Sequence, residues 1–303
     1  MCIRDSNYID LAWAAQEILE RAVVSLVNHT VDQTGIKNLC MAGGVAMNCK
    51  LNGRLLNTSK IESIFVQPAS ADDGTSIGAA KIVAQNYGDN IRETLKHTQY
   101  GPAFSNEEVL NTLKGCKIKF QEVEDVAEVT AELLARGKLV GWHQGAMELG
   151  ARALGGRSIL ANPLDPSVKD KVNNKVKYRE SWRPFCPSLT SESRKDYLNP
   201  GEKTPFMIVA QDAKALMQNE TPAVVHVDNT VRPQTVESEV SERYHSMISE
   251  FGKKTGHPVV LNTSLNVRSE PIACNPLDTI RCFFSTGLDA LVIENFVIDK
   301  TNL

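Results

Sequence analysis

The sequence has no uninterrupted run of about 20 apolar residues, which is the length a transmembrane helix needs. It also lacks an excess of basic residues, because 33 Lys and Arg face 36 Asp and Glu for a net charge of −3. Such a balance gives no footprint for general DNA or RNA binding, so we expect neither a membrane nor a nucleic-acid partner. A hydrophobic content of 42% excludes a disordered chain, and 303 residues suggest about two domains.

Paired cysteines are absent as well. The seven cysteines are an odd number, are scattered, and include no C-x-x-C pair. Cys40 and Cys282 lie in apolar stretches, where a thiol acts as a small hydrophobic side chain. No charged segment followed by an apolar one opens the chain, so a signal peptide is not indicated. We interpret the cysteines as structural and expect a cytoplasmic protein.

Apolar periodicity predicts alternating helices and strands in the first hundred residues. Apolar residues recur at helical spacing from Leu11 to Leu26. Two short apolar strands and two helices follow, at Lys37–Ala42, Val45–Asn57, Ser63–Gln67 and Ser76–Tyr87. Such alternation predicts an α/β fold built from βαβ units with a mostly parallel sheet.

A polar stretch broken by Gly101-Pro102 indicates a domain boundary near residue 100. Beyond it the pattern predicts helices at Val126–Arg136 and Leu277–Phe284. It predicts strands at Lys117–Val123, Leu139–His143, Phe206–Ala210, Val224–Val227, Val259–Leu261 and Ala290–Ile293. The second part is therefore also expected to be α/β.

Two strand ends in the first part carry candidate ligand-binding residues. Gly43 and Gly44 join a strand to a helix, where glycines let a backbone approach a phosphate, although a plain structural turn is the more common reason for such a pair. Asp72 and Asp73 follow the next strand and could ligate a metal ion or cap the following helix.

Cations and glycines concentrate in the second part. Between Met147 and Ser158, glycines at 150, 155 and 156 alternate with Arg152 and Arg157, a pattern that favours an anion site. Lys177, Arg179 and Arg183 follow beside Trp182 and Phe185, which we interpret as core residues. The alternative for these three cations is a solvated charged face.

Polar residues also follow two later strands. His226, Asp228 and Arg232 lie in one loop, and Asn262–Asn266 offers hydroxyl and amide groups to a ligand or to a turn. Together with the cations, these segments indicate a ligand that carries several phosphate or carboxylate groups.

Six ordered segments resemble those of the O-carbamoyltransferases, the enzymes of nodulation and antibiotic tailoring. The resemblance covers nearly the whole chain from about residue 8 and rests on Ala42–Asn48, Asp72–Ala80, Met147–Ser158, Lys177–Ser188, His226–Gln234 and Asn262–Asn266. It implies that residues 101–303 form a YrdC-like domain that makes carbamoyl-adenylate from carbamoyl phosphate and ATP. It implies that residues 7–100 are part of an actin/hexokinase-like (Kae1-like) domain that transfers the carbamoyl group to a hydroxyl of a small molecule.

The resemblance also implies roles for individual residues. The expected catalytic set, which binds the phosphates and the carbamoyl-adenylate, is Arg152, Arg157, Lys177, Arg179, Arg183, His226, Asp228 and Arg232. The expected nucleotide-binding set is Gly43, Gly44, Asn48, Ser158, Asn262, Thr263, Ser264 and Asn266. Asp72 would be one ligand of a metal, which is Fe²⁺ in the family, and Mg²⁺ would accompany ATP.

The chain also departs from the family pattern. Its six histidines include no H-x-x-x-H metal-binding pair, which the family carries in the first half of the transfer domain. We therefore expect a fragment that lacks that half, opened by a foreign Met1–Ser6. Ala151 stands where Pro is usual, Ala146 where Arg is common, and Asn229 where Gly is usual.

Two other hypotheses remain. One is a threonylcarbamoyl-adenylate enzyme of tRNA modification, which uses the same chemistry but needs a nucleic-acid partner. The other is a nucleotide-binding module without catalysis. Neither the acceptor nor the oligomeric state follows from the sequence.

Overall fold

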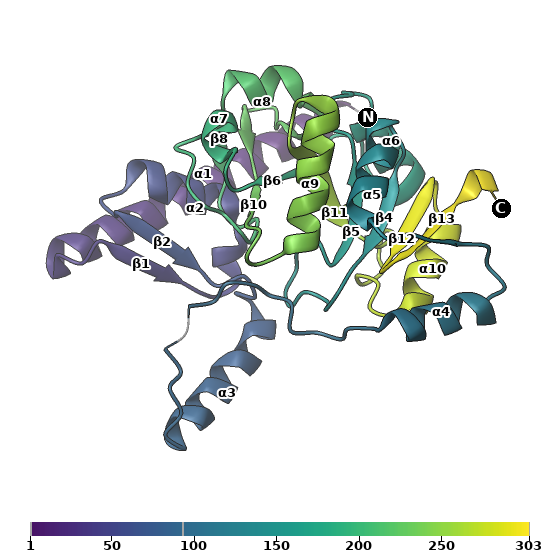
Figure 1. The fold of residues 1–303 in the computed structure, drawn as a ribbon. Coiled ribbons are helices and arrows are strands. Elements are labelled where there is room, and N and C mark those ends of the chain that lie inside the picture. The colour runs from purple at the N-terminus through teal and green to yellow at the C-terminus, as the bar shows by residue number, and fades with distance from the viewer. Residues whose placement is uncertain (1, 93, 303) are drawn as a thin grey trace. The chain divides into compact units, whose positions relative to one another are not determined.

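The computed structural model describes residues 2–92 and 94–302, and the chain divides into two compact units. One unit contains Met1–Ile91 together with Ile208–Ala210, and the other contains Arg92–Met207 together with Gln211–Leu303. We call them the first and the second unit. Each has its own strands and apolar core (Figure 1).

The first unit is a small α/β arrangement around two parallel strands. Its elements are α1 (Cys2–Thr34), β1 (Asn38–Met41), η1 (Gly44–Met47), α2 (Cys49–Thr58), β2 (Ser63–Val66), η2 (Asp72–Gly74) and α3 (Thr75–Asn86). The core contains Val27 and Val31 of α1 packed with Leu51 and Leu55 of α2. The pairing of β1 with β2 is parallel, as the alternation predicted.

The helix predicted at Val45–Asn57 is divided at Asn48. The Asn48 side chain accepts a hydrogen bond from the backbone N–H of Leu51 at 3.2 Å, so it caps the N-terminus of α2. The preceding turn, η1, is a separate 3₁₀ segment.

The second unit contains the larger sheet and most of the helices. Its helices are α4 (Asn106–Gly115), α5 (Val126–Ala135), α6 (Val168–Val172), η3 (Asn173–Lys177), α7 (Arg194–Tyr197), α8 (Ala215–Glu220), η4 (Pro222–Val224), α9 (Glu242–Thr255), α10 (Pro276–Phe284) and η5 (Lys300–Asn302). Its strands are β3 (Gln121–Glu122), β4 (Val140–His143), β5 (Arg157–Ala161), β6 (Cys186–Thr190), β7 (Leu198–Asn199), β8 (Gln211–Ala213), β9 (Thr230–Val231), β10 (Gln234–Val236), β11 (Val259–Ser264), β12 (Ala290–Ile293) and β13 (Phe296–Asp299).

Eight of these strands form one mixed sheet in the order β10-β6-β11-β5-β4-β12-β13-β3. Within it β10 with β6 and β12 with β4 are parallel, and the other neighbours are antiparallel. The α/β class is thus confirmed, and this sheet, for which the sequence predicted no strand directions, is mostly antiparallel. The reason is that β4 reaches β5, and β12 reaches β13, without an intervening helix, so these pairs run antiparallel.

Both faces of the sheet are buried. Val140, Trp142 and Leu160 pack on one face with α5 and α9, whereas Ile159 and Leu291 pack on the other with α4 and α10. Strands covered on both faces read as continuous apolar runs, which is how β4 and β12 appear in the sequence. Figure 1 shows α5 and α9 on one side of these strands and α4 and α10 on the other.

Three predicted strands are corrected. Residues 206–210 form no strand, because Ile208–Ala210 bonds to the start of α2 instead, with Ala210 N 3.0 Å from Cys49 O. Residues 224–227 follow the turn η4. In Lys117–Val123 only β3 pairs, since Lys117 has φ +54° and its N–H closes the end of α4 on Lys114 O.

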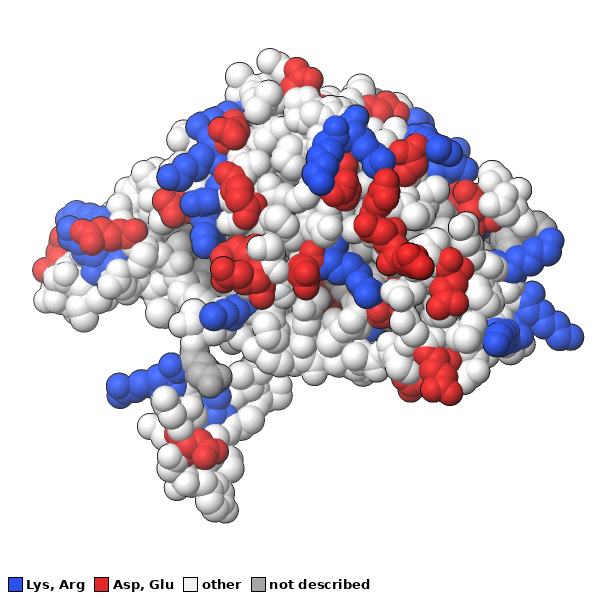
Figure 2. All heavy atoms as spheres, in the orientation of Figure 1, with Lys and Arg blue, Asp and Glu red and all other residues white. Residues whose placement is uncertain are grey.

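Within the described residues, no helix combines the length and the apolarity needed to span a bilayer. The six described cysteines are free thiols. Acidic and basic side chains are interspersed over the face shown in Figure 2.

Candidate functional site: a cavity lined by arginines

The predicted site segments of the second unit converge where three strands meet. Strand β11 lies between β5 and β6 and runs antiparallel to both. The end of β11 therefore lies beside the beginnings of its neighbours, with Asn262 opposite Cys186 and Ser264 opposite Ser158. Segments more than 100 residues apart in sequence are thereby brought to one place.

A cavity opens at this place, and we call it the arginine cavity. It is lined by Ala151, Arg152, Ala153, Arg179, Pro184, Phe185, Cys186, Met207, Arg232, Asn262, Thr263 and Ser264. Six of these were predicted as site residues, namely Arg152, Arg179, Arg232, Asn262, Thr263 and Ser264. Among the described residues that line it, three are cationic and none is acidic, which suits an anion with several oxygens.

Two of the arginines are held in place by side chains around the cavity. Nε of Arg179 donates to Asn173 Oδ1 at 2.8 Å, and its guanidinium lies 4.7 Å from the ring centroid of Phe185. Arg232 donates from Nε and Nη2 to the sulfur of Cys186, at 3.0 and 2.9 Å. Burial and the nearby Arg183 lower the pKa of Arg179, as expected for cations gathered out of water.

Asn262 leaves one buried acceptor open in the wall of the cavity. Its side chain is 1% exposed, and Nδ2 donates to Ala153 O, Ser188 Oγ and Gln234 Oε1 at 3.1, 3.0 and 3.2 Å. Its Oδ1 has no hydrogen-bond partner within the described part of the chain. A buried acceptor without a donor is costly, so a bound ligand with an N–H group would stabilise this site.

Lys177 lies behind the arginine cavity instead of lining it. Its ammonium donates to Ser264 O, to Ser264 Oγ at 3.2 Å, and to Asn266 O and Oδ1 at 3.1 and 2.7 Å. Burial, with a smaller contribution from Arg179, lowers its pKa to about 7. Lys177 therefore fixes the turn that carries Ser264 and Asn266, and Asn266 itself does not line the cavity.

Arg157 holds backbone segments together instead of facing the cavity, which corrects our interpretation of it as a phosphate ligand. Its side chain is fully buried and donates to five backbone carbonyls at 3.0–3.2 Å, those of Pro102, Gln144, Gly145, Gly156 and Cys274. Arg157 does not line the arginine cavity. Its guanidinium instead ties together the loops behind the start of β5.

Two of the three glycines between 147 and 158 are also explained by packing. A Cβ on Gly155 would lie 2.4 Å from Cδ1 of Tyr244, and its φ is +105°. A Cβ on Gly156 would lie 2.9 Å from Glu148 Oε2. The Glu148 carboxylate accepts hydrogen bonds from Leu154 N and Gly156 N at 2.7 and 2.5 Å, so it organises this loop from behind. Ser158 is buried and accepts from Gly155 N at 3.2 Å.

Arg183 and the 226–230 loop lie outside the arginine cavity. Arg183 pairs with Glu180 at 3.2 Å and lies 5.8 Å from the centroid of Trp182, which is 70% exposed, so the prediction of a core Trp182 is wrong. Phe185, at 1% exposure, is a core residue as predicted.

His226 and Asp228 both bond to Thr230 within a tight turn. His226 Nδ1 lies 3.1 Å from Thr230 Oγ1, and Asp228 Oδ1 accepts from the same hydroxyl at 2.7 Å. Asn229 has φ +58° in this turn, a conformation open to both Asn and Gly, so an Asn at this departure from the family pattern needs no change of backbone.

The predicted residues of the first unit have local structural partners. Asn48 caps α2 and donates to Gln16 Oε1 at 2.9 Å. Gly43, at φ +94°, donates its N–H to Ser70 O at 2.7 Å. A Cβ added to Gly43 or to Gly44 would meet no atom of the described residues within 4 Å. Open backbone of this kind would allow a ligand to approach closely, but the surrounding described residues do not indicate which ligand.

Asp72 is exposed in η2, and the described residues contain no group of three or more His, Cys, Asp or Glu able to hold a metal ion. The described residues therefore do not form a complete metal centre by themselves, and the role of Asp72 as one ligand of such a centre stays a prediction.

Sequence reasoning did not identify three residues that organise the site. Cys186 receives the Arg232 guanidinium, Gln234 bonds Asn262, and Glu148 caps the loop before β5. All three lay inside recognised motifs, but their roles depend on which strands become neighbours.

Two protein-family models match the chain. "Carbamoyltransferase N-terminus" matches residues 3–81, and "Carbamoyltransferase C-terminus" matches residues 131–300, more than half of the sequence. Among curated relatives, nodulation protein NolO of Bradyrhizobium diazoefficiens and nodulation protein NolNO of Sinorhizobium fredii are each 40% identical over 96% of this chain. The match covers 54% and 44% of those two proteins, so the chain spans about half the length of the curated relatives it matches.

Solved structures show weaker similarity. Full-length HypF, in a phosphate- and nucleotide-bound form, has a TM-score of 0.39 and 16% identity, over 60% of this chain and 23% of that one. Sua5 from P. abyssi has a TM-score of 0.41 and 14% identity, over 57% of this chain and 50% of that one. At these scores we assign no shared fold. One family model, in contrast, matches more than half of the residues, and therefore the chain belongs to the carbamoyltransferase family.

Proposed function

We propose that the second unit binds carbamoyl phosphate and ATP in the arginine cavity and forms carbamoyl-adenylate there. The observation that carries this proposal is the lining of the cavity, where Arg152, Arg179 and Arg232 surround a space without an acidic side chain among the described residues. Two polyanionic substrates repel each other in water, and fixed guanidinium groups offset that repulsion. Membership of the carbamoyltransferase family supports a carbamoyl donor as one of the two.

The open acceptor of Asn262 supports the same assignment. Phosphate oxygens offer no donor at neutral pH, whereas the NH₂ of a carbamoyl group offers two N–H bonds. Asn262 Oδ1, buried in the wall beside Arg152 and Arg179, would accept one of them. The cavity thus combines cations for the phosphates with an acceptor for the carbamoyl nitrogen.

The proposed reaction balances with one water molecule. Carbamoyl phosphate, ATP and water give carbamoyl-adenylate, inorganic phosphate and pyrophosphate. Water releases inorganic phosphate from carbamoyl phosphate, and a carbamate oxygen then bonds to the α-phosphorus while the bond from that phosphorus to pyrophosphate breaks. The arginines of the cavity would hold the phosphoryl oxygens during this exchange. In a protein of the relatives' full length, a second site would then transfer the carbamoyl group to a hydroxyl of a small molecule.

We further propose that residues 101–303 correspond to a YrdC-like adenylate-forming domain and residues 7–100 to part of a Kae1-like transfer domain. The first unit, with its two-stranded sheet and small core, would supply part of the transfer site. Gly43, Gly44 and Asn48 stay candidates for nucleotide contacts there.

Pyrophosphate exchange tests the proposal. The chain should incorporate labelled pyrophosphate into ATP in the presence of Mg²⁺ only when carbamoyl phosphate is added. Arg179→Met should reduce this exchange by at least about 10-fold, because a charge-assisted contact to phosphate is lost. Arg136→Met, an exposed arginine at the end of α5, is the matched control. Exchange that needs threonine and bicarbonate instead, or no exchange in folded protein, would reject the proposal.

A further inference from the structure

Cys186 places a thiol inside the arginine cavity. It lies at the start of β6, lines the cavity, and receives two N–H groups of Arg232 at 3.0 and 2.9 Å. Cys282, in contrast, is buried in the apolar core, and burial raises the pKa of its thiol to about 11. Reactive cysteines lie in accessible cationic surroundings, whereas cysteines buried among apolar residues are inert. The position of Cys186 therefore indicates a reactive thiol.

The charge of the cavity favours reactions in which negative charge develops. Arg152, Arg179 and Arg232 line it, and none of its described lining residues is acidic. Fixed cations in a partly dry site stabilise a leaving anion without having to reorganise. The two N–H groups of Arg232 also stabilise negative charge on the Cys186 sulfur itself.

A second observation points to the product of such a reaction. Asn262 lies directly opposite Cys186 in the antiparallel pairing of β11 with β6, and side chains at opposite positions lie on the same face of a sheet. The Asn262 side chain is 1% exposed, and its Oδ1 has no hydrogen-bond partner within the described residues. A hydroxyl carried by the Cys186 sulfur would donate to this buried acceptor.

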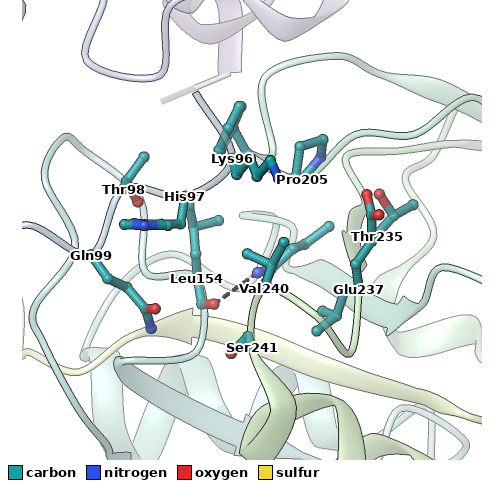
Figure 3. A pocket seen from close by; sticks show the side chains of 13 residues that line it. Lys96, His97, Thr98, Gln99, Leu154, Pro205, Thr235, Glu237, Val240 and Ser241 are labelled. Carbon is teal, nitrogen blue, oxygen red and sulfur yellow. Dashed lines mark hydrogen bonds between the residues drawn. The ribbon is translucent and has the colours of Figure 1, made fainter. Parts of the chain in front are cut away.

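The orientation of the Asn262 amide is fixed by its neighbours. Its Nδ2 donates to Ala153 O at 3.1 Å, and a carbonyl can only accept, so a reversed amide would place two oxygens together. Gln234 Oε1 accepts from the same Nδ2 at 3.2 Å, and Gln234 Nε2 donates to Leu154 O at 2.7 Å, the bond that Figure 3 shows at Leu154. Both amides are thus held by backbone carbonyls, and the open atom of Asn262 is its oxygen.

We propose that Cys186 is a site of reversible oxidation by hydroperoxides and that its oxidised form weakens anion binding in the arginine cavity. Hydrogen peroxide is little larger than water and therefore small enough for this cavity. The sulfur attacks one peroxide oxygen, the O–O bond breaks, and the hydroxide that leaves takes the thiol proton to give water. Sulfur loses two electrons to the peroxide and becomes a sulfenic acid. Two molecules of a thiol reductant restore the Cys186 thiol and leave a disulfide and water.

The sulfenic acid changes the cavity in two ways. Its hydroxyl occupies the acceptor that Asn262 offers, and its oxygen competes with a bound anion for the donors of Arg232. The consequence for carbamoyl phosphate and ATP rests on the proposed function, whereas the reactivity of the thiol does not.

Trapping of the sulfenic acid with dimedone tests the reactivity. The whole chain is treated with hydrogen peroxide, and peptide mass spectrometry follows the dimedone adduct at each cysteine. Cys186 should be labelled at least about 10-fold faster than the exposed Cys116, because the cations stabilise the hydroxide that leaves. Arg232→Met should remove most of this difference, whereas Arg136→Met, the exposed control, should not. Labelling of Cys186 no faster than that of Cys116 in folded protein would overturn the proposal.

Pyrophosphate binding tests the effect on the cavity. Oxidation should weaken binding about 10-fold, and dithiothreitol should restore it. In Cys186→Ser the affinity should be the same before and after peroxide, whereas Cys116→Ser should respond as the parent does. A loss that persists in Cys186→Ser, or that dithiothreitol does not reverse, would place the oxidation elsewhere, for example at Met207 of the same cavity, and overturn the proposal.

The two measurements also separate this proposal from the proposed function. If the untreated chain binds no pyrophosphate, the anion site is rejected, and with it the predicted weakening. Labelling of Cys186 then still decides whether its thiol is a site of oxidation, because that reaction needs neither phosphate nor nucleotide.

Discussion

The ammonium of Lys177 lies 2.7 Å from Oδ1 of Asn266, and the two residues are 89 positions apart in sequence. The same ammonium donates to the backbone carbonyl of Asn266 and to both oxygens of Ser264. One buried cation thus joins the end of η3 to the turn after β11. The wall of the arginine cavity that contains Ser264 depends on this contact.

Lys177 should make stability depend on pH in a defined window. Burial lowers its pKa from 10.5 to about 7, so between these values the unfolded chain binds the proton and the folded chain does not. The free energy of unfolding should therefore rise with pH across this window, and the gain should be lost as pH falls through 7. In Lys177→Met this component is absent.

Urea denaturation of both proteins between about pH 6.5 and 9.5 measures the difference. The stability of the parent relative to Lys177→Met should increase steadily over that range. Two stability curves that stay parallel would show that Lys177 titrates as an ordinary lysine.

Arg157 and Arg179 should respond to the same substitution to different extents. Arg157→Met removes the hydrogen bonds of a fully buried guanidinium to five backbone carbonyls and should lower the free energy of unfolding by about 3–5 kcal/mol. Arg179→Met removes the hydrogen bond to Asn173 and a ring contact, and should cost about 1–2 kcal/mol. Urea denaturation near neutral pH compares them, and equal losses would contradict the architectural assignment of Arg157.

The sequence predicted the elements whose apolar pattern is set locally. Strands β4 and β12 and helices α5 and α10 were predicted close to their observed bounds, because each is a dense apolar segment with clear ends. Residues 206–210 are also mostly apolar, but Ile208 and Ala210 bond to α2, a partner that no local pattern specifies. The direction of a strand could likewise not be predicted from its local sequence, since it depends on whether a helix separates it from the strand it pairs with.

The candidate site, too, could be predicted only in part from the sequence. The cluster of cations was visible in the sequence, and Arg152, Arg179 and Arg232 do share one cavity. Residue type could not separate Arg179, which lines that cavity, from Arg157, which donates to backbone carbonyls. The difference arises from strand register, which places Arg157 at the covered start of β5 opposite His143.

Gly155 should tolerate no side chain. A Cβ there would overlap the ring of the buried Tyr244 and would occupy a φ of +105°, so Gly155→Ala should destabilise the chain by about 2–4 kcal/mol. Gly78→Ala, in the first turn of α3 with no described atom within 4 Å of the added carbon, should instead stabilise by about 0.5–1 kcal/mol. Thermal unfolding of the two variants should therefore shift in opposite directions, and a shift in one direction for both would contradict the packing argument.

The arginine cavity should bind a polyanion even without catalysis. Pyrophosphate at about 100 times its Kd should raise the free energy of unfolding by about 2.7 kcal/mol, because it binds the folded chain alone. Arg179→Met and Arg232→Met should each weaken that binding about 10- to 100-fold, since each removes a charge-assisted contact, whereas Arg136→Met should not.

Thermal unfolding at increasing pyrophosphate concentrations, repeated at low and high salt, measures this effect. Stabilisation by pyrophosphate should shrink with salt, because dissolved ions screen charge interactions, although less in the cavity than at the surface. It should persist in the Arg136→Met control, which leaves the arginines of the cavity unchanged. An equal response in all four proteins would place the anion elsewhere on the chain and remove the physical basis for assigning the phosphates to this cavity.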